Sequence, residues 1–266
     1  MTLQWHSRLL DLPDGTQINS LHGTQPDGRG RPTLVLLHEA LGCLAMWKKF
    51  PERLALETGC DVFIYERRGY GESSLITLPR PDDYLVEEGR DWLGLVLQAA
   101  GLEKVVLVGH SDGGSVALVG AACLPEQVVG LITMAAHIYV DHLTSAGIDE
   151  AVLRYQRTDL PQRLARYLGE RTELLFRAWH ETWSRASFRV GLDLTFWLER
   201  IDCPSLIIQG RDDQYGVREQ VADICAGIGA KAQPLLLDDC GHVPHLEAEA
   251  AVLAAIDQFL TSHLVE

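Results

Sequence analysis

The sequence predicts an α/β fold: a mainly parallel, doubly wound sheet with an antiparallel hairpin at its N-terminal end and an inserted α-helical cap. Short apolar runs alternate with segments of helical spacing along most of the 266 residues. The runs are nearly continuous, which is typical of strands covered on both faces by helices. One long interval contains no convincing strand, and this interval predicts the insertion.

The N-terminal hairpin is predicted from residues 1–23. Apolar and polar side chains alternate there around the sequence Pro13-Asp14-Gly15-Thr16. An Asp-Gly pair favours the positive φ angles of a tight hairpin turn. The segment therefore predicts two antiparallel strands at one edge of the sheet.

The remaining strands and helices are predicted to alternate. We expect strands at residues 34–37, 62–65, 105–108, 128–134, 206–208 and 235–237. We expect helices at residues 47–57, 84–100, 115–123, 217–228 and 248–260. Right-handed crossovers between such strands build a mainly parallel sheet with helices on both faces.

The cap is predicted at residues 140–201, so the core would consist of residues 1–139 and 202–266. Apolar side chains recur at helical spacing in this interval, and Trp179 and Trp183 are among them. An aromatic stripe of this kind is either packing core or one wall of a substrate pocket. A cap with an inner face can provide both.

The composition limits the classes of function. The chain has 23 Lys and Arg against 37 Asp and Glu, a formal net charge of −14, and 47% hydrophobic residues. These residues are enough for one large core, whereas nucleic acids and anionic membranes would repel the protein. The partners expected are a small-molecule substrate and, for a homodimer, a second copy of the chain.

The N-terminal segment and the cysteines indicate a cytoplasmic protein. The first 16 residues contain no basic segment followed by an apolar stretch, as a secretory signal would, and no run of 18 uncharged apolar residues occurs. The six cysteines form no Cys-x-x-Cys pair, which favours reduced thiols over a disulfide framework or a zinc site. They are Cys43, Cys60, Cys123, Cys203, Cys225 and Cys240.

The strongest chemical motif is the sequence Gly109-His110-Ser111-Asp112-Gly113, which follows a predicted strand and precedes a helix of small residues. Glycines on both sides allow a sharp strand-to-helix turn. The turn presents Ser111 above the sheet, where the helix dipole stabilises negative charge. Ser111 is the candidate nucleophile, and the alternative is a glycine-rich turn without chemistry.

A serine nucleophile requires a general base. His242 is the candidate, because it lies on the loop between the last predicted strand and the last helix. His245 follows three residues later, so a metal site is the alternative, but no third ligand lies at a suitable spacing. His110 is expected to pack rather than to act as a base. No metal and no cofactor are expected.

The base needs a carboxylate to orient it. Asp212 and Asp213 both follow the predicted strand at residues 206–208. One of them can face His242, while the other caps the turn or is solvated.

In the order Ser111, Asp213, His242, these residues resemble the α/β-hydrolase superfamily, and the resemblance covers nearly the whole chain. Members carry the acid at the fourth position of Gly-x-x-Asp, so the resemblance implies Asp213 rather than Asp212. It also implies a Gly-His on the final loop, here Gly241-His242. The members resembled are capped esterases, C–C bond hydrolases and amino-acid-ester hydrolases.

The resemblance further implies an oxyanion hole formed by the backbone N–H groups of Ala40 and Asp112. The first oxyanion loop of the family usually reads His-Gly-x, whereas this chain reads His38-Glu39-Ala40. Residues 66–73, Glu-Arg-Arg-Gly-Tyr-Gly-Glu-Ser, resemble a structural turn of the family. Their Gly-x-Gly is not expected to bind phosphate, because no helix with further glycines follows.

The sequence therefore predicts a cofactor-independent serine hydrolase that cleaves a small carboxylic ester or related acyl compound through an acyl-enzyme. The same triad serves the alternative, C–C bond hydrolysis of a vinylogous diketone. A ligand-sensing protein on a hydrolase fold is the alternative of another class. The residues expected to contact the substrate are Glu39, Asp112, His137, Trp179 and Trp183.

Asp112 has two interpretations. A carboxylate beside an oxyanion hole opposes transition-state stabilisation unless something compensates its charge. Asp112 either pairs with an arginine or with local backbone N–H groups, or it anchors a cationic group of the substrate. The resemblance of Ser-Asp-Gly-Gly, residues 111–114, to amino-acid-ester hydrolases implies the second.

Overall fold

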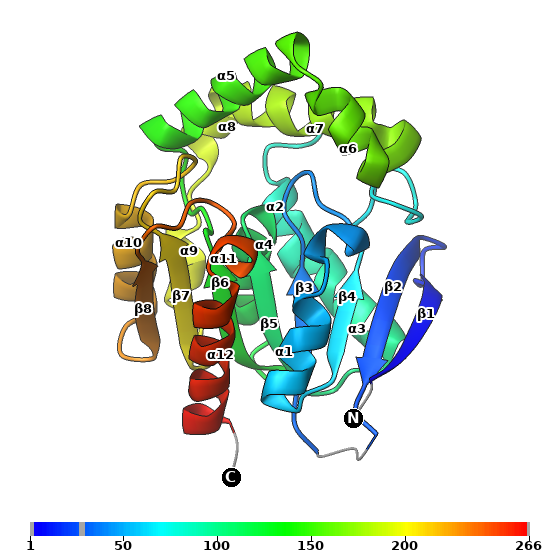
Figure 1. Cartoon of the computed structure of the whole chain (residues 1–266), viewed down its shortest axis with the longest axis vertical. Helices are drawn as coiled ribbons and strands as arrows, with labels where there is room; N and C mark the ends of the chain where they lie inside the picture. The colour runs from blue at the N-terminus through cyan, green and yellow to red at the C-terminus, as the bar shows by residue number, and fades with distance from the viewer. Residues whose placement is uncertain (1–2, 27–29, 265–266) are drawn as a thin grey trace.

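A computed structural model of the chain describes residues 3–26 and 30–264. These residues contain an 8-stranded sheet with the strand order β1-β2-β4-β3-β5-β6-β7-β8 (Figure 1). The strands are β1 (Gln4–Asp11), β2 (Gln17–Thr24), β3 (Thr33–Leu37), β4 (Val62–Tyr65), β5 (Val105–His110), β6 (Val128–Met134), β7 (Ser205–Gly210) and β8 (Ala232–Leu237). Strand β2 pairs antiparallel with β1 and β4, and the other pairs are parallel. The predicted fold class is confirmed.

The N-terminal hairpin forms where the sequence predicts it. Gly15 takes a positive φ of 85°, which a residue without a Cβ adopts at little cost. Asp14 contributes differently from the prediction: its carboxylate accepts hydrogen bonds from the backbone N–H and the hydroxyl of Thr16, both at 2.9 Å. The turn is therefore stabilised by one glycine and one side-chain acceptor.

The helices are α1 (Phe50–Thr58), α2 (Tyr84–Glu87), α3 (Leu93–Ala100), α4 (Asp112–Cys123), α5 (His142–Arg157), α6 (Leu160–Leu168), α7 (Thr172–Ser184), α8 (Ala186–Gly191), α9 (Thr195–Leu198), α10 (Glu219–Ile228), α11 (Pro244–Glu247) and α12 (Glu249–His263). Helices α1 and α12 cover one face of the sheet, and α3, α4 and α10 cover the other (Figure 1). The single helix predicted at residues 84–100 is interrupted by a π-helical turn, Glu88–Trp92. Gly89 lies in this turn, and a Cβ there would come within 2.7 Å of the Val116 carbonyl oxygen of α4.

The core lies on both faces of the sheet, as the unbroken apolar runs predict. Along β3, Leu34 and Leu36 face α1 and α12, whereas Val35 and Leu37 face α3 and α4. All four side chains are fully buried. Strand β8 departs from this pattern, because it lies at the edge of the sheet and its first residues are partly exposed.

Residues 140–201 contain α5 to α9. Helices α5 to α8 lie beyond the carboxyl ends of the strands (Figure 1). Helix α9 instead contacts α4 and α10 of the core. The division of the chain into a core and a separate cap at residues 140–201 stays a prediction. In the described ranges, none of the helices has both the length and the apolar character required to span a membrane.

Candidate active site

The turn between β5 and α4 holds Ser111 in an unusual backbone conformation, with φ 54° and ψ −121°. The flanking glycines make this possible. A Cβ on Gly109 would lie 2.2 Å from the carbonyl oxygen of Gly113, and a Cβ on Gly113 would lie 2.1 Å from that of Leu37. No larger residue fits at either position without displacing backbone. Such strain costs about 1–3 kcal/mol and occurs where the surroundings enforce it.

Ser111, His242 and Asp213 form one continuous chain of hydrogen bonds. His242 lies between β8 and α11, and its Nε2 is 2.9 Å from Ser111 Oγ. Its Nδ1 is 2.9 Å from Asp213 Oδ1 and 3.0 Å from Oδ2. All three side chains are buried. With the proton on Nδ1, the free Nε2 can accept the proton of the serine hydroxyl.

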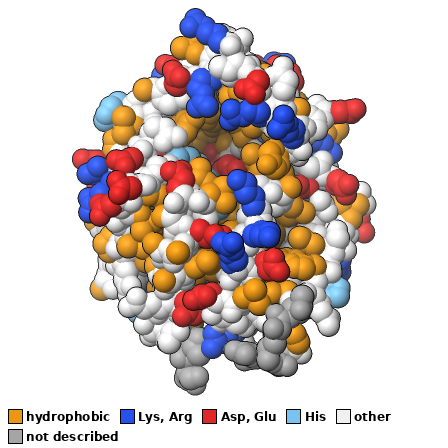
Figure 2. Space-filling model, viewed as in Figure 1, with side chains coloured by type: hydrophobic (Ala, Val, Ile, Leu, Met, Phe, Trp, Pro, Cys, Tyr) orange, Lys and Arg blue, Asp and Glu red, His pale blue; other side chains and the backbone are white. Residues whose placement is uncertain are grey.

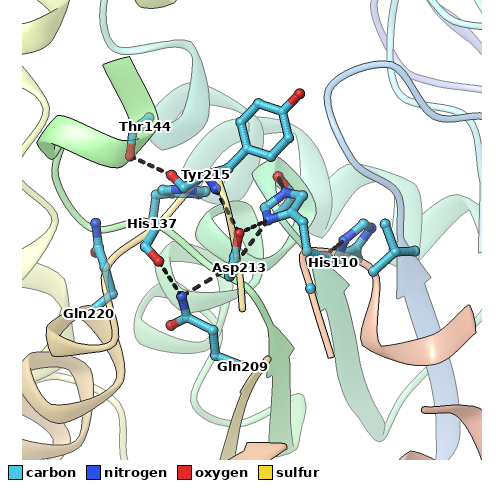
Figure 3. A network of polar contacts seen from close by, with 12 residues as sticks. His110, His137, Thr144, Gln209, Asp213, Tyr215 and Gln220 are labelled. Atoms are coloured by element: carbon cyan, nitrogen blue, oxygen red, sulfur yellow. Dashed lines mark hydrogen bonds and ion pairs between the residues drawn. The ribbon is translucent and has the colours of Figure 1, made fainter. Parts of the chain in front are cut away.

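Asp213 is held by its own neighbours as well as by His242 (Figure 3). The backbone N–H of Tyr215 donates to Oδ1 at 2.8 Å, and the Gln209 amide donates to Oδ2 at 3.2 Å. Burial by itself raises the pKa of Asp213, but the charge and hydrogen bond of His242 and the Tyr215 N–H outweigh it, so the pKa is lowered. Asp212 is exposed, and it contacts this region through its backbone N–H, which donates to the Cys240 carbonyl at 2.9 Å.

The two residues expected to supply the oxyanion donors, Ala40 and Asp112, lie at the same cavity as Ser111. Ala40 follows β3, and Asp112 is the first residue of α4, so its N–H has no partner within the helix. Within residues 3–26 and 30–264, neither N–H has a hydrogen-bond acceptor. Both residues line the cavity that contains Ser111 and His242. The geometry leaves both donors available to a ligand oxygen.

This cavity has a volume of about 140 Å³. In Figure 2 the surface is hollowed below the helices at the top of the view, with hydrophobic side chains around the hollow. The residues that line the cavity are Glu39, Ala40, Leu41, Ser111, Asp112, His137, Thr144, Ile148, Trp179, Trp183, Tyr215 and His242. All the residues that the sequence predicted as substrate contacts are among them.

Four lining residues were not found by sequence reasoning: Leu41, Thr144, Ile148 and Tyr215. For Tyr215 a signal existed, because it lies two residues after the candidate acid on the same loop. Thr144 and Ile148 belong to α5, and nothing in the sequence indicates which face of that helix is turned to the sheet. Trp179 and Trp183 both line the cavity, so this part of the aromatic stripe forms a wall. Phe176 in the same stripe stacks on Tyr155 at 3.7 Å between ring centroids, which is packing.

His137 joins the cavity to the loop that carries Asp213. Its Nε2 donates to the Tyr215 carbonyl at 2.9 Å, and the Thr144 hydroxyl donates to the same oxygen at 2.6 Å (Figure 3). Burial, reinforced by the neighbouring His242, lowers the pKa of His137. The ring is therefore neutral near pH 7, with its proton on Nε2.

Asp112 is already paired. The Tyr84 hydroxyl donates to Asp112 Oδ2 at 2.7 Å, and Arg67 Nη2 lies 3.5 Å from the same oxygen. The Arg67 and Asp112 side chains are both 1% exposed. The indole N–H of Trp183 in turn donates to the Tyr84 hydroxyl at 2.8 Å. Of the two interpretations from the sequence, the structure therefore shows the pairing with an arginine.

The comparisons with known proteins show the family to which the chain belongs. The model of a family described as "Alpha/beta hydrolase family" matches residues 34–255. The chain belongs to the alpha/beta hydrolase family. A human protein named serine hydrolase BPHL is 29% identical over 156 residues, or 57% of this chain, and the chain spans only 53% of that relative. A mouse sn-1-specific diacylglycerol lipase, ABHD11, is 26% identical over 255 residues, covering 86% of this chain and 81% of the relative.

A solved structure gives the same fold. The 2-hydroxy-6-oxo-6-phenylhexa-2,4-dienoate hydrolase BphD from Rhodococcus sp. strain RHA1 superposes with a TM-score of 0.78 and 18% sequence identity. The match covers 98% of this chain and 100% of that one. At this identity the likeness is evidence for the fold alone.

This alpha/beta hydrolase has an acid, Glu39, where the family usually has glycine, and the acid lies against a histidine. Glu39 Oε2 is 3.5 Å from His110 Nδ1, and His110 Nε2 donates to the His242 carbonyl at 2.8 Å. Burial opposes the charge on both groups, but the contact between them lowers the pKa of Glu39 to about 2 and raises that of His110. His110 is buried as expected, and it also connects the oxyanion loop to the His242 loop.

His245 packs among aromatic side chains. Its ring lies against Trp47 and Phe50, at 4.7 and 5.4 Å between centroids, and burial lowers its pKa to about 3. Both ring nitrogens of His242 are occupied by Ser111 and Asp213. No group of three or more potential metal ligands occurs in the described part of the chain.

Proposed function

We propose that this alpha/beta hydrolase is a serine esterase that cleaves a small carboxylic ester through an acyl-enzyme. The observation that carries the proposal is the hydrogen-bond chain from Asp213 through His242 to Ser111, with 2.9 Å at both His242 nitrogens. A serine within hydrogen-bond distance of a histidine that is itself oriented by a carboxylate is the arrangement that nucleophilic catalysis requires.

In the first half of the reaction, Ser111 Oγ attacks the ester carbonyl while His242 Nε2 takes the hydroxyl proton. The carbonyl oxygen becomes an oxyanion, which accepts hydrogen bonds from the N–H groups of Ala40 and Asp112. When the tetrahedral intermediate collapses, the bond to the alcohol breaks and His242 returns the proton to the departing oxygen. The acyl group then remains on Ser111.

In the second half, water replaces the alcohol. His242 takes a proton from the water, the hydroxide attacks the acyl carbonyl, and Ser111 leaves with the proton that His242 returns. Asp213 holds the imidazole in the required tautomer throughout and stabilises its positive charge. The products are a carboxylic acid and an alcohol.

The cavity favours a small and largely apolar substrate. Its volume of about 140 Å³ is close to that of engineered cavities of roughly 150 Å³ that hold benzene. Ile148, Trp179 and Trp183 supply apolar walls. The carboxylate of Asp112 is compensated by Arg67, so it leaves no free charge to attract a substrate cation. An ester with a short acyl group or one ring fits this site best.

The experiment is an activity screen over esters, thioesters, lactones and vinylogous diketones, with Ser111→Ala as the blank. In parallel, a sulfonyl fluoride is added and the labelled residue is identified by mass spectrometry. Ser184→Ala, which changes an exposed serine at the end of α7, is the matched control. We expect ester turnover in wild type and in the control, and one label on Ser111.

The other candidate functions predict different results in the same screen. A C–C bond hydrolase would prefer the vinylogous diketone to the esters, using the same three residues. A ligand-sensing protein would turn over none of the compounds. We also propose that the enzyme works in the cytoplasm, where the six free cysteines would stay reduced.

A further inference from the structure

A second cavity, of about 340 Å³, lies next to the candidate active site. Arg67, Tyr70 and Tyr84 line it, and each of them contacts an active-site residue. Arg67 and Tyr84 bind the Asp112 carboxylate, and the Tyr70 hydroxyl donates to the Ala40 carbonyl at 2.7 Å. The cavity is thus distinct from the one that contains Ser111, and the contacts of Arg67 and Tyr84 with Asp112 connect the walls of the two cavities.

Arg80 also lines this cavity, and its charge has no direct counter-ion. The residue is 6% exposed. Among the described residues no carboxylate lies within ion-pair distance of it, whereas Arg67 faces Asp112 and Arg68 pairs with Glu88 at 3.0 Å. Burial of a guanidinium without a charged partner is strongly unfavourable. The Tyr70 and Tyr84 rings, at 5.4 and 4.9 Å from the guanidinium carbon, offset only part of this cost.

The hydrogen bonds of the two arginines also favour an anionic ligand at this cavity. Arg80 Nη2 donates to the Tyr70 hydroxyl at 3.0 Å. In the described ranges, Arg80 Nη1 and Arg67 Nε are buried and have no hydrogen-bond acceptor. Buried polar groups are rarely left without a partner, and each exception calls for an explanation. One unpartnered nitrogen on each of two guanidinium groups that line the same cavity favours an anionic acceptor as its ligand.

We propose that this cavity binds a small organic carboxylate through the guanidinium of Arg80, with Arg67 as a second donor. A carboxylate matches the planar fork of an arginine. A single negative charge fits, because one guanidinium lacks a counter-ion and because Glu87 and Glu88 on the same cavity would repel a dianion such as phosphate. Leu75, Ile76 and Pro79 supply apolar surface for the organic part.

The test uses 4-bromobenzoate as the probe. Calorimetry measures its affinity for wild type, Arg80→Gln, Arg80→Lys and the matched control Arg163→Gln, whose side chain is 53% exposed on α6. The neutral analogue 4-bromobenzamide shows whether the charge is required. A crystal soaked in the probe then locates the bromine by anomalous scattering.

We expect the bromine beside Arg80 in wild type, with affinity about 10- to 100-fold weaker in Arg80→Gln and intermediate in Arg80→Lys. Arg163→Gln should bind as wild type does, and the benzamide should bind weakly or not at all. If Arg80→Gln fails to fold, Arg80→Lys and the bromine position still decide the question. Three results would overturn the proposal: bromine found only beside Ser111, equal binding of the neutral analogue, or unchanged affinity in the Arg80 variants. None of these outcomes depends on whether the enzyme hydrolyses esters.

Discussion

Replacement of Asp213 by asparagine tests the proposed mechanism most directly, because it changes one atom in the hydrogen-bond chain. Oδ1 of Asp213 accepts from His242 and Tyr215, and Oδ2 accepts from His242 and Gln209. An amide has only one oxygen to serve these donors. Its NH₂ group must therefore take one of the two places, and each place lies within 3.0 Å of His242 Nδ1.

The orientation of the amide follows from its neighbours. The Tyr215 N–H is backbone and cannot turn, so the asparagine oxygen takes the Oδ1 place and the NH₂ takes the Oδ2 place. There the NH₂ lies 3.0 Å from His242 Nδ1 and can donate to it, so the tautomer with the imidazole proton on Nε2, which the aspartate disfavours, is stabilised. A protonated Nε2 cannot accept the proton of Ser111. In the serine-protease template the same change lowers kcat about 10⁴-fold, or about 5.5 kcal/mol in activation free energy, and we expect a similar loss here.

The assay is kcat and KM for an activated ester of a short-chain acid. Asp212→Asn is the matched control, because it removes the same charge one residue away on an exposed side chain. We expect the control to stay within about threefold of wild type, and KM to change little in Asp213→Asn. Circular dichroism of both variants checks that the fold is kept. More than a tenth of wild-type kcat in Asp213→Asn, or a large loss in Asp212→Asn, would refute the reasoning.

Four further predictions follow from the site. Ser111→Ala and His242→Ala should each abolish turnover, and the double variant should lose no more than either single one, because the residues act as a unit; additive losses in kcat would contradict this. Glu39→Gln should lower the free energy of unfolding by about 1 kcal/mol. The Glu39 carboxylate adds to the free energy of unfolding above its ordinary pKa of 4.5, and this stabilisation is lost as the pH falls toward about 2. The protonated His110 adds to it below its ordinary pKa of 6.5, and this stabilisation is lost as the pH rises through its raised pKa. Denaturant titrations should therefore find the largest difference in the free energy of unfolding between wild type and Glu39→Gln at pH 4.5 to 6.5. A difference that stays constant from pH 4 to 9 would exclude the ion pair. Treatment with a chelator should leave kcat/KM unchanged, since both nitrogens of His242 are occupied by protein groups; a loss that zinc restores would count against the mechanism. An α-amino ester should be hydrolysed no more than about threefold faster than its des-amino analogue, because Asp112 is already paired, and a tenfold preference would show that it binds a cation.

The sequence was sufficient for the fold wherever a local signal coincided with a packing requirement. The central strands are buried on both faces, so their apolar runs are unbroken and their positions could be predicted. The turn at Ser111 could also be predicted, since Gly109 and Gly113 are needed to avoid backbone clashes. Helix α4 nevertheless begins at Asp112 rather than at residue 115, because helix ends depend on backbone geometry that small residues do not specify.

The cavity could be predicted only in part, because its walls come from segments far apart in the chain. His137 follows β6, Trp179 and Trp183 lie on α7, and Ile148 lies on α5. The helical spacing in residues 140–201 shows that these helices have apolar faces. It does not say how each helix is rotated relative to the sheet, and that rotation decides which side chains reach Ser111.

Asp112 illustrates the same limit at a single residue. Its sequence neighbours allowed either a substrate anchor or a structural pair, and the difference depends on Arg67 and Tyr84, which are 45 and 28 residues away. Strands β4 and β5 both pair in parallel with β3, so their carboxyl ends meet at one edge of the sheet and bring Arg67 to the nucleophile turn. The arginine charge offsets the carboxylate beside the two N–H donors. An acid can therefore occupy the position after Ser111 without opposing the negative charge that the proposed reaction develops there.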